Sequence, residues 1–154
     1  MLGLYEKDHQ ILFCGDHILG KITPNITYWG DEFGDSLGIY LKNIEKIKDL
    51  EIKYLFSSHR FLVADANARI DELIAHHNER LKDCLEIIRK LGKADTTEIT
   101  KKMQWDIKAK DWNDFPASQK WFAVGEAAAH LKHLVMQDII KEEVTDGIGY
   151  YSII

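Results

Sequence analysis

The chain has 154 residues, of which 45% are hydrophobic and 29% are charged, and its formal net charge is −5 at pH 7. These values are typical of one or two small globular domains that can bury a core. The negative charge argues against a dedicated binder of nucleic acid or of an anionic membrane, because such proteins usually carry a basic surface. No apolar run approaches the roughly 20 residues that a membrane-spanning helix needs.

The compartment is predicted from the cysteines and the N-terminus. Cys14 and Cys84 form no CxxC pair and no disulfide framework, which favours a reducing compartment. The polar residues 6–9 interrupt the apolar residues at the N-terminus before a signal peptide can form. We therefore expect a cytoplasmic protein.

A strand that ends at a carboxylate is the first feature with chemical interest. Segments 2–5 and 10–14 are predicted strands around a polar turn, and the apolar run Ile11–Cys14 is expected to be buried on both faces. It stops at Gly15, and Asp16 follows. A strand end fixes a side chain beside an open loop, so Asp16 can be a ligand or a base. The alternative is that Asp16 only turns the chain.

A second strand presents a histidine in the same way. Residues 51–56 are predicted to form a short buried strand, which is followed by His59. Between the two strands, a long loop over 15–34 leads to a helix that Asp35 or Ser36 can cap. This strand–helix–strand order predicts a crossover and a parallel or mixed sheet pairing.

The order of strand, carboxylate, helix, strand and histidine resembles the second half of a metallo-β-lactamase-fold hydrolase. Further segments share this resemblance: Gly15–His17, Ile22–Ile26, Trp29, Asp35–Leu37, Arg69–Ile70 and His76–Leu81. The resemblance implies an α+β fold of α/β type, namely the second half of an αββα sandwich. It implies that Asp16 bridges two metals and that His59 is the last metal-binding histidine. It also implies a loop bordering the metal site.

That loop would place His17, Thr23 and Tyr28 near the substrate. Packing of the loop or exposure to solvent is the alternative for each of them.

The chain also departs from the resembled family. The family's HxHxDH motif is absent, as is the separate histidine that precedes the aspartate, and Ser57–Arg60 stands where the family has Pro-Gly-His-Gly. We therefore expect a C-terminal part of a longer hydrolase, inactive alone. The parent would use zinc, or iron or manganese, and act on a small molecule. Whether this chain alone binds any metal stays open.

A long helix is predicted over 65–91. His77 falls on its apolar stripe as a packing residue, and His76 cannot join it around one ion because adjacent helical residues point roughly 100° apart. After Gly92, Asp95 and Glu98 form a capping box for a short helix.

A further helix is predicted to reach about residue 139, and a hairpin then turns at Asp146–Gly147. The residues of this helix that are expected to face inward are Trp121, Val124, Gly125, Ala128, Leu131, Val135 and Ile139.

The helices and the hairpin resemble a winged helix, so we expect a partial metallo-β-lactamase half over 1–64, a connecting helix over 65–91 and a winged-helix-like domain over 92–154. The last helix of the winged-helix-like domain would direct the side chains of Lys120, His130, Lys132, His133 and Gln137 outward. Acidic residues such as Glu126, Asp138 and Glu142–Glu143 would repel phosphate. A role in packing, dimerisation or as a lid is favoured over binding of nucleic acid.

Three functions therefore stand: part of a metal-dependent hydrolase, a non-catalytic oligomerisation or ligand-binding module, and a winged helix that binds nucleic acid. Since the stretch 2–56 would expose apolar sheet surface without its other half, we also expect a homodimer or higher homo-oligomer.

Overall fold

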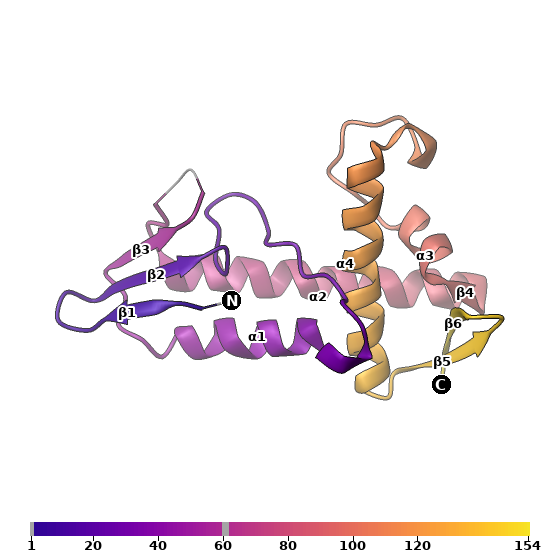
Figure 1. The fold of residues 1–154 in the computed structure, drawn as a ribbon, viewed down its shortest axis with the longest axis horizontal. Helices are drawn as coiled ribbons and strands as arrows, with labels where there is room; N and C mark the ends of the chain where they lie inside the picture. The colour runs from indigo at the N-terminus through magenta and orange to yellow at the C-terminus, as the bar shows by residue number, and fades with distance from the viewer. Residues whose placement is uncertain (1, 60–61) are drawn as a thin grey trace. The chain divides into compact units, whose positions relative to one another are not determined.

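The computed structural model describes residues 2–59 and 62–154. The described elements, labelled in Figure 1, are β1 Leu4–Glu6, β2 Ile11–Gly15, η1 Asp31–Phe33, α1 Ser36–Ile47, β3 Tyr54–Ser57, α2 Ala66–Leu91, β4 Ala94–Asp95, α3 Thr96–Lys102, η2 Trp112–Asp114, α4 Ala117–Met136, β5 Ile140–Thr145 and β6 Ile148–Ile153. None of the helices in the described segments combines the length and apolarity that a bilayer span requires.

The chain is divided into two compact units. The first unit contains Met1–Pro24 and Ile39–His76, and the second unit contains Asn25–Gly38 and His77–Ile154. The loop that follows β2 thus begins in the first unit and ends in the second.

The first unit is built on the sheet β1-β2-β3, which Figure 1 shows as neighbouring arrows. β1 pairs antiparallel with β2, and β2 pairs parallel with β3 after the crossover through α1. The turn between β1 and β2 is held by the Glu6 carboxylate, which accepts the backbone N–H groups of Asp8 and His9 at 2.9 Å each. The predicted hairpin and the predicted parallel crossover are confirmed.

Only one face of β2 is buried. Leu12 and Cys14 are almost fully covered, whereas Phe13 between them is 50% exposed and stacks on Phe56 with ring centroids 5.2 Å apart. The expectation that this strand is buried on both faces is therefore wrong for the described chain. A short run of apolar residues does not distinguish a strand buried on one face from a strand buried on both, because it contains no alternation of polar and apolar residues.

Large apolar side chains cover the other face of this sheet. The register pairs Phe13 with Leu4 and with Phe56, so these three residues lie on the same face, together with Tyr54 two residues before Phe56. Each of the four is between 39% and 66% exposed. We call Leu4, Phe13, Tyr54 and Phe56 the open sheet face.

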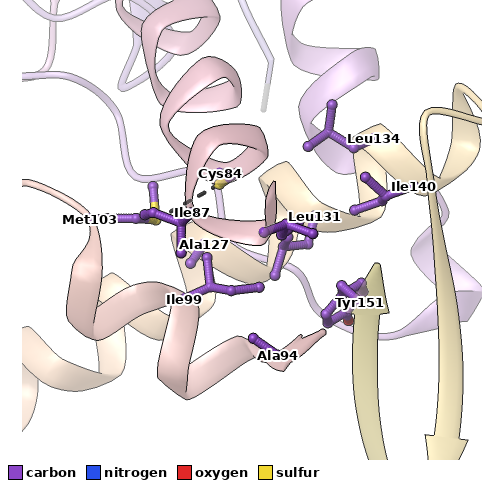
Figure 2. Packing of buried hydrophobic residues seen from close by; sticks show 11 residues of the cluster. Cys84, Ile87, Ala94, Ile99, Met103, Ala127, Leu131, Leu134, Ile140 and Tyr151 are labelled. Atoms are coloured by element: carbon purple, nitrogen blue, oxygen red, sulfur yellow. Dashed lines mark hydrogen bonds between the residues drawn. The ribbon is translucent and has the colours of Figure 1, made fainter. Parts of the chain in front are cut away.

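The second unit packs helices on the antiparallel sheet β4-β6-β5. Its core, shown in Figure 2, joins side chains from α2, α3, α4 and the sheet, among them Cys84, Ile99, Leu131, Ile140 and Tyr151. The buried thiol of Cys84 lies 3.8 Å from the Met103 sulfur. All residues of this core lie within 77–154, the larger segment of the second unit.

Local signals set several boundaries of the second unit. Asp95 and Glu98 form the predicted capping box at the start of α3. Asp146 and Gly147 both have positive φ values, 52° and 77°, as a two-residue type I′ hairpin turn requires. The strand β4 is missing from the sequence-based expectation because it has only two residues.

The buried face of α4 differs from the expected one. Its buried residues are Ala123, Ala127, Ala129, His130, Leu131, His133 and Leu134. Trp121 is 55% exposed and Ile139 follows the end of the helix, so these two inward assignments are wrong. The outward assignments of His130 and His133 are wrong too. Apolar and small residues occur on several sides of α4, so its periodicity does not select one face.

Two buried histidines link α2 to α4. His77 and His130 are fully covered, and their ring nitrogens Nδ1 and Nε2 lie 3.1 Å apart. His130 Nδ1 lies 2.8 Å from the Glu126 carbonyl oxygen, which can only accept, so this nitrogen carries a proton. His77 Nδ1 then donates to His130 Nε2. The prediction that His77 is a hydrogen-bonded packing residue is confirmed.

The segment 25–38, which we call the strap, lies along α4. The Tyr28 N–H donates to the Gly125 carbonyl at 3.1 Å, and Lys132 and His133 bind Asp31 and Asp35 at 2.5 and 2.7 Å. Asp35 also accepts the Gly38 N–H at 2.8 Å, so it caps α1 as the sequence predicts.

Gly125 is required where the strap meets α4, because a Cβ added there would lie 2.7 Å from Thr27 Cγ2. We expect Gly125→Ala to lower the free energy of unfolding by about 1–3 kcal/mol, the usual range for an overpacked site. Urea unfolding followed by circular dichroism measures this loss. Adding Thr27→Ser removes the opposing methyl group and should restore part of the stability. Equal stability of Gly125→Ala and the wild type would contradict the close approach.

Candidate functional site

Asp16 and His59 lie side by side in the first unit. They follow the carboxyl ends of the neighbouring parallel strands β2 and β3, where Gly15 pairs with Ser57. The Ser58 N–H donates to the Gly15 carbonyl at 3.1 Å, and Gly15 turns the chain with a φ of 56°. Because both strands deliver their next residues to the same sheet edge, His59 Nε2 comes within 3.1 Å of Asp16 Oδ1.

Both side chains of this pair are more than half exposed, at 57% for His59 and 55% for Asp16. A carboxylate oxygen and a neutral imidazole nitrogen are both ligands for zinc and for other divalent metals. Across residues 2–59 and 62–154, no group of three or more His, Cys, Asp and Glu side chains could hold a metal ion. Since a zinc site takes four ligands, the pair fits a metal site in part only. Arg60, which replaces a family glycine, lies outside the described residues.

The loop after Asp16 is held by Arg69 on α2. The Arg69 guanidinium donates to the carbonyl oxygens of Leu19 at 2.7 Å and of Ile22 at 3.1 Å, and it also binds Glu72 at 2.7 Å. The arginine side chain is only 13% exposed. A planar guanidinium with several donors suits this task, because it satisfies two carbonyls that no strand or helix pairs. The path of the chain beyond Asp16 is thereby fixed within the first unit.

His17, a predicted substrate-loop residue, packs toward the interior of the first unit. Its ring meets Tyr40 edge-on at 5.1 Å between centroids, and the Tyr40 hydroxyl donates to the His17 carbonyl at 3.1 Å. Burial lowers the pKa of His17, so the ring is neutral at pH 7. The residue lines a cavity of about 260 Å³ together with Cys14 and Asn43. Within the described segments, no hydrogen bond joins its Nδ1 to another group.

The other two predicted substrate-loop residues lie in different units. Thr23 is half-buried in the first unit, whereas Tyr28 belongs to the strap in the second unit. The Tyr28 hydroxyl donates to Asp31 at 2.8 Å, and burial together with this hydrogen bond raises the pKa of Tyr28 to about 12. The roles of His17, Thr23 and Tyr28 toward a substrate stay predictions.

Sequence reasoning did not find the pairing of Trp29 with Trp121. The two indole rings meet in the second unit with centroids 5.9 Å apart, although they come from distant parts of the chain. The sequence shows the two tryptophans, but it does not show that the segment 25–38 lies along α4, and only this arrangement brings the two rings together.

Comparisons with known proteins point to one fold. No protein-family model matches the chain. A curated protein from Caenorhabditis elegans, described as a beta-lactamase-like protein 2 homolog, is 24% identical over 144 residues, which is 94% of this chain and 42% of that protein.

Two crystal structures are similar to the chain over 99% of its length. A beta-lactamase domain protein from Burkholderia ambifaria matches with a TM-score of 0.80, and a metallo-beta-lactamase family protein from Thermus thermophilus matches with a TM-score of 0.78. Both are 24% identical, and the chain covers 44% of each. The chain thus spans less than half the length of the proteins it matches. Its mixed α/β structure has the fold of the corresponding part of a metallo-β-lactamase-fold protein, which confirms the fold class predicted for the sheet.

Proposed function

We propose that the chain is the C-terminal part of a metal-dependent hydrolase of the metallo-β-lactamase superfamily and that Asp16 and His59 belong to its metal centre. The observation that carries this proposal is the 3.1 Å approach of the two side chains at the ends of parallel strands. The fold shared with metallo-β-lactamase-fold proteins supports it.

Each side chain has a separate task in this proposal. With its two oxygens, the Asp16 carboxylate would hold two metal ions, and His59 would hold one of them through a neutral ring nitrogen. The metals would supply an activated water for hydrolysis of a small-molecule substrate. Zinc is the first candidate, and iron or manganese also suits mixed imidazole and carboxylate ligands. The remaining ligands come from the HxHxDH segment of the longer protein, so this chain alone is inactive.

Binding of zinc to the isolated chain tests the pair. After equilibrium dialysis against ZnCl₂, inductively coupled plasma mass spectrometry should find zinc on the wild type and much less on Asp16→Ala/His59→Ala. The matched control is His9→Ala, which removes another exposed histidine beside a carboxylate, with His9 Nδ1 2.9 Å from Glu6 Oε2, and leaves the Glu6 carboxylate that holds the turn. This control should keep the zinc. Zinc retained in equal, near-stoichiometric amounts by the wild type and the Asp16/His59 variant would count against the proposal. Absence of zinc from both would mean that the pair needs the ligands of the longer protein.

The open sheet face supports the same proposal. Domains bury the apolar face of a sheet against another layer, and a contiguous exposed apolar patch marks an interaction site. We infer that this face packs on the other sheet-and-helix half in the longer protein. In the isolated chain a second copy covers it, which gives the homo-oligomer expected from the sequence.

Light scattering tests the self-association. The wild type should be a dimer or a higher oligomer, and Phe13→Asp/Phe56→Asp should be a monomer, because two carboxylates on this face oppose its burial. Val144→Asp/Ile148→Asp is the matched control, since both residues are exposed apolar positions in the second unit, at 69% and 48%. It should associate like the wild type. A clean wild-type monomer at high concentration would refute the idea.

We further infer that α2, β4, α3, α4, β5 and β6 form a winged helix that serves packing. The element order and the strand order β4-β6-β5 support the assignment. Several side chains that the expected recognition helix would offer to DNA are buried or bound to other residues. His130 and His133 are buried, and Lys132 binds Asp31. Glu143 in the hairpin accepts hydrogen bonds from Lys141 and Lys93, which lower its pKa to about 2. These two lysines are therefore already paired with a carboxylate.

A column of immobilised duplex DNA distinguishes packing from recognition. At a low salt concentration of about 50 mM, where phosphate contacts are strong, we expect no retention of the wild type. Glu142→Lys/Glu143→Lys is the sensitivity control and should gain retention that salt removes. Salt-sensitive retention of the wild type would instead favour the nucleic-acid hypothesis.

A further inference from the structure

A groove of about 460 Å³ lies between the strap and α4, within the second unit. Its lining consists of Thr27, Tyr28, Trp29 and Gly30 from the strap, and Trp121, Val124, Gly125 and Ala128 from α4. Volumes of this size are common for sites that take small molecules, which are usually concave and mostly apolar.

Two tryptophans belong to the lining of this groove. The rings of Trp29 and Trp121 meet edge to face at 5.9 Å between centroids, yet the residues are 61% and 55% exposed. Packing in a core would hide this apolar surface, whereas here the ring surfaces remain open to solvent. Aromatic rings gain about 0.5–1.5 kcal/mol from a stacked or edge-to-face partner beyond burial of area.

The helix side of the groove includes two small residues beside Trp121 and Val124. Gly125 has no side chain, and the strap approaches it so closely that an added Cβ would meet Thr27. Ala128 follows three residues later, on the same side of the helix. The close contact between Thr27 and Gly125 therefore holds this wall of the groove in place before any ligand arrives.

The charges around the groove exclude an anion from it. No residue of the lining carries a formal charge, and the Tyr28 hydroxyl already donates to Asp31. The Glu32 carboxylate lies against Gly30, since a Cβ added at Gly30 would be 2.9 Å from Glu32 Cδ. The Lys132 ammonium group, which lies 6.0 Å from the centre of the Tyr28 ring, is bound to Asp31 at 2.5 Å. Since no formal charge lines the groove, it favours a ligand whose inserted part is uncharged.

We propose that this groove binds an uncharged planar aromatic molecule, which stacks against Trp29 and Trp121. The inference needs no metal and does not depend on the hydrolase proposal, because neither Asp16 nor His59 lines the groove. An aliphatic molecule, an aromatic anion and a second copy of the chain are the competing occupants, and the test separates them.

Titration of the ¹⁵N-labelled chain with 2-naphthol tests the proposal, because the indole N–H signals of the four tryptophans report separate places. The signals of Trp29 and Trp121 should shift with saturation, while those of Trp105 and Trp112 stay in place. Cyclohexanol and 2-naphthoate should bind more weakly. Shifts of all four signals, no saturation up to the solubility limit of 2-naphthol, or equal affinity for cyclohexanol or 2-naphthoate would overturn the proposal.

Variants identify the residues. Trp121→Ala should weaken binding of 2-naphthol about tenfold, the equivalent of one aromatic contact. Trp112→Ala removes a tryptophan of the same unit that is not part of the lining, and it should bind like the wild type. An equal loss in both variants would overturn the assignment. Movement of the Trp29 and Trp121 signals on dilution alone would show that a second copy fills the groove instead.

Discussion

The close approach of the strap to Gly125 is the constraint on which much of the second unit depends. The Tyr28 N–H reaches a helix carbonyl, and Thr27 occupies the space that a side chain at position 125 would need. The ion pair of Lys132 with Asp31 adds little, because Asp31 is 79% exposed and water screens a pair at the surface. Steric fit at Gly125 and the largely buried pair of His133 with Asp35 therefore fix where the strap lies. That position in turn sets the cap of α1 and one wall of the aromatic groove.

The same loop is fixed a second time in the first unit. Arg69 holds the carbonyl groups of Leu19 and Ile22, just beyond the end of β2. A loop of about 20 residues is unusual unless it is anchored or functional. Here each unit anchors its own part of the loop, and so Asp16 is presented by a strand end whose following chain has a defined path.

Local signals in the sequence predicted the elements well. Asp35, Asp95 and the Asp146–Gly147 turn each act on backbone groups a few residues away, so their effect can be read from spacing. The approach of Asp16 to His59 was also predictable, since the order of strand, helix and strand places both residues at one sheet edge. Features that depend on distant partners were not predictable from spacing. Only the placement of the helices decides which side of β2 is covered, and the buried face of α4 depends likewise on the strap and on the core of the second unit.

The two cysteines can report on local opening of the structure, because one thiol lies in each unit. Cys14 is buried in the first unit and Cys84 in the second. Burial raises the pKa of both thiols, that of Cys84 to about 12, so neither forms the reactive thiolate while its surroundings are closed. Alkylation at either sulfur must then wait for the structure around it to open. The ratio of the two labelling rates would compare how often each half of the molecule opens, without any added fluorophore or engineered residue.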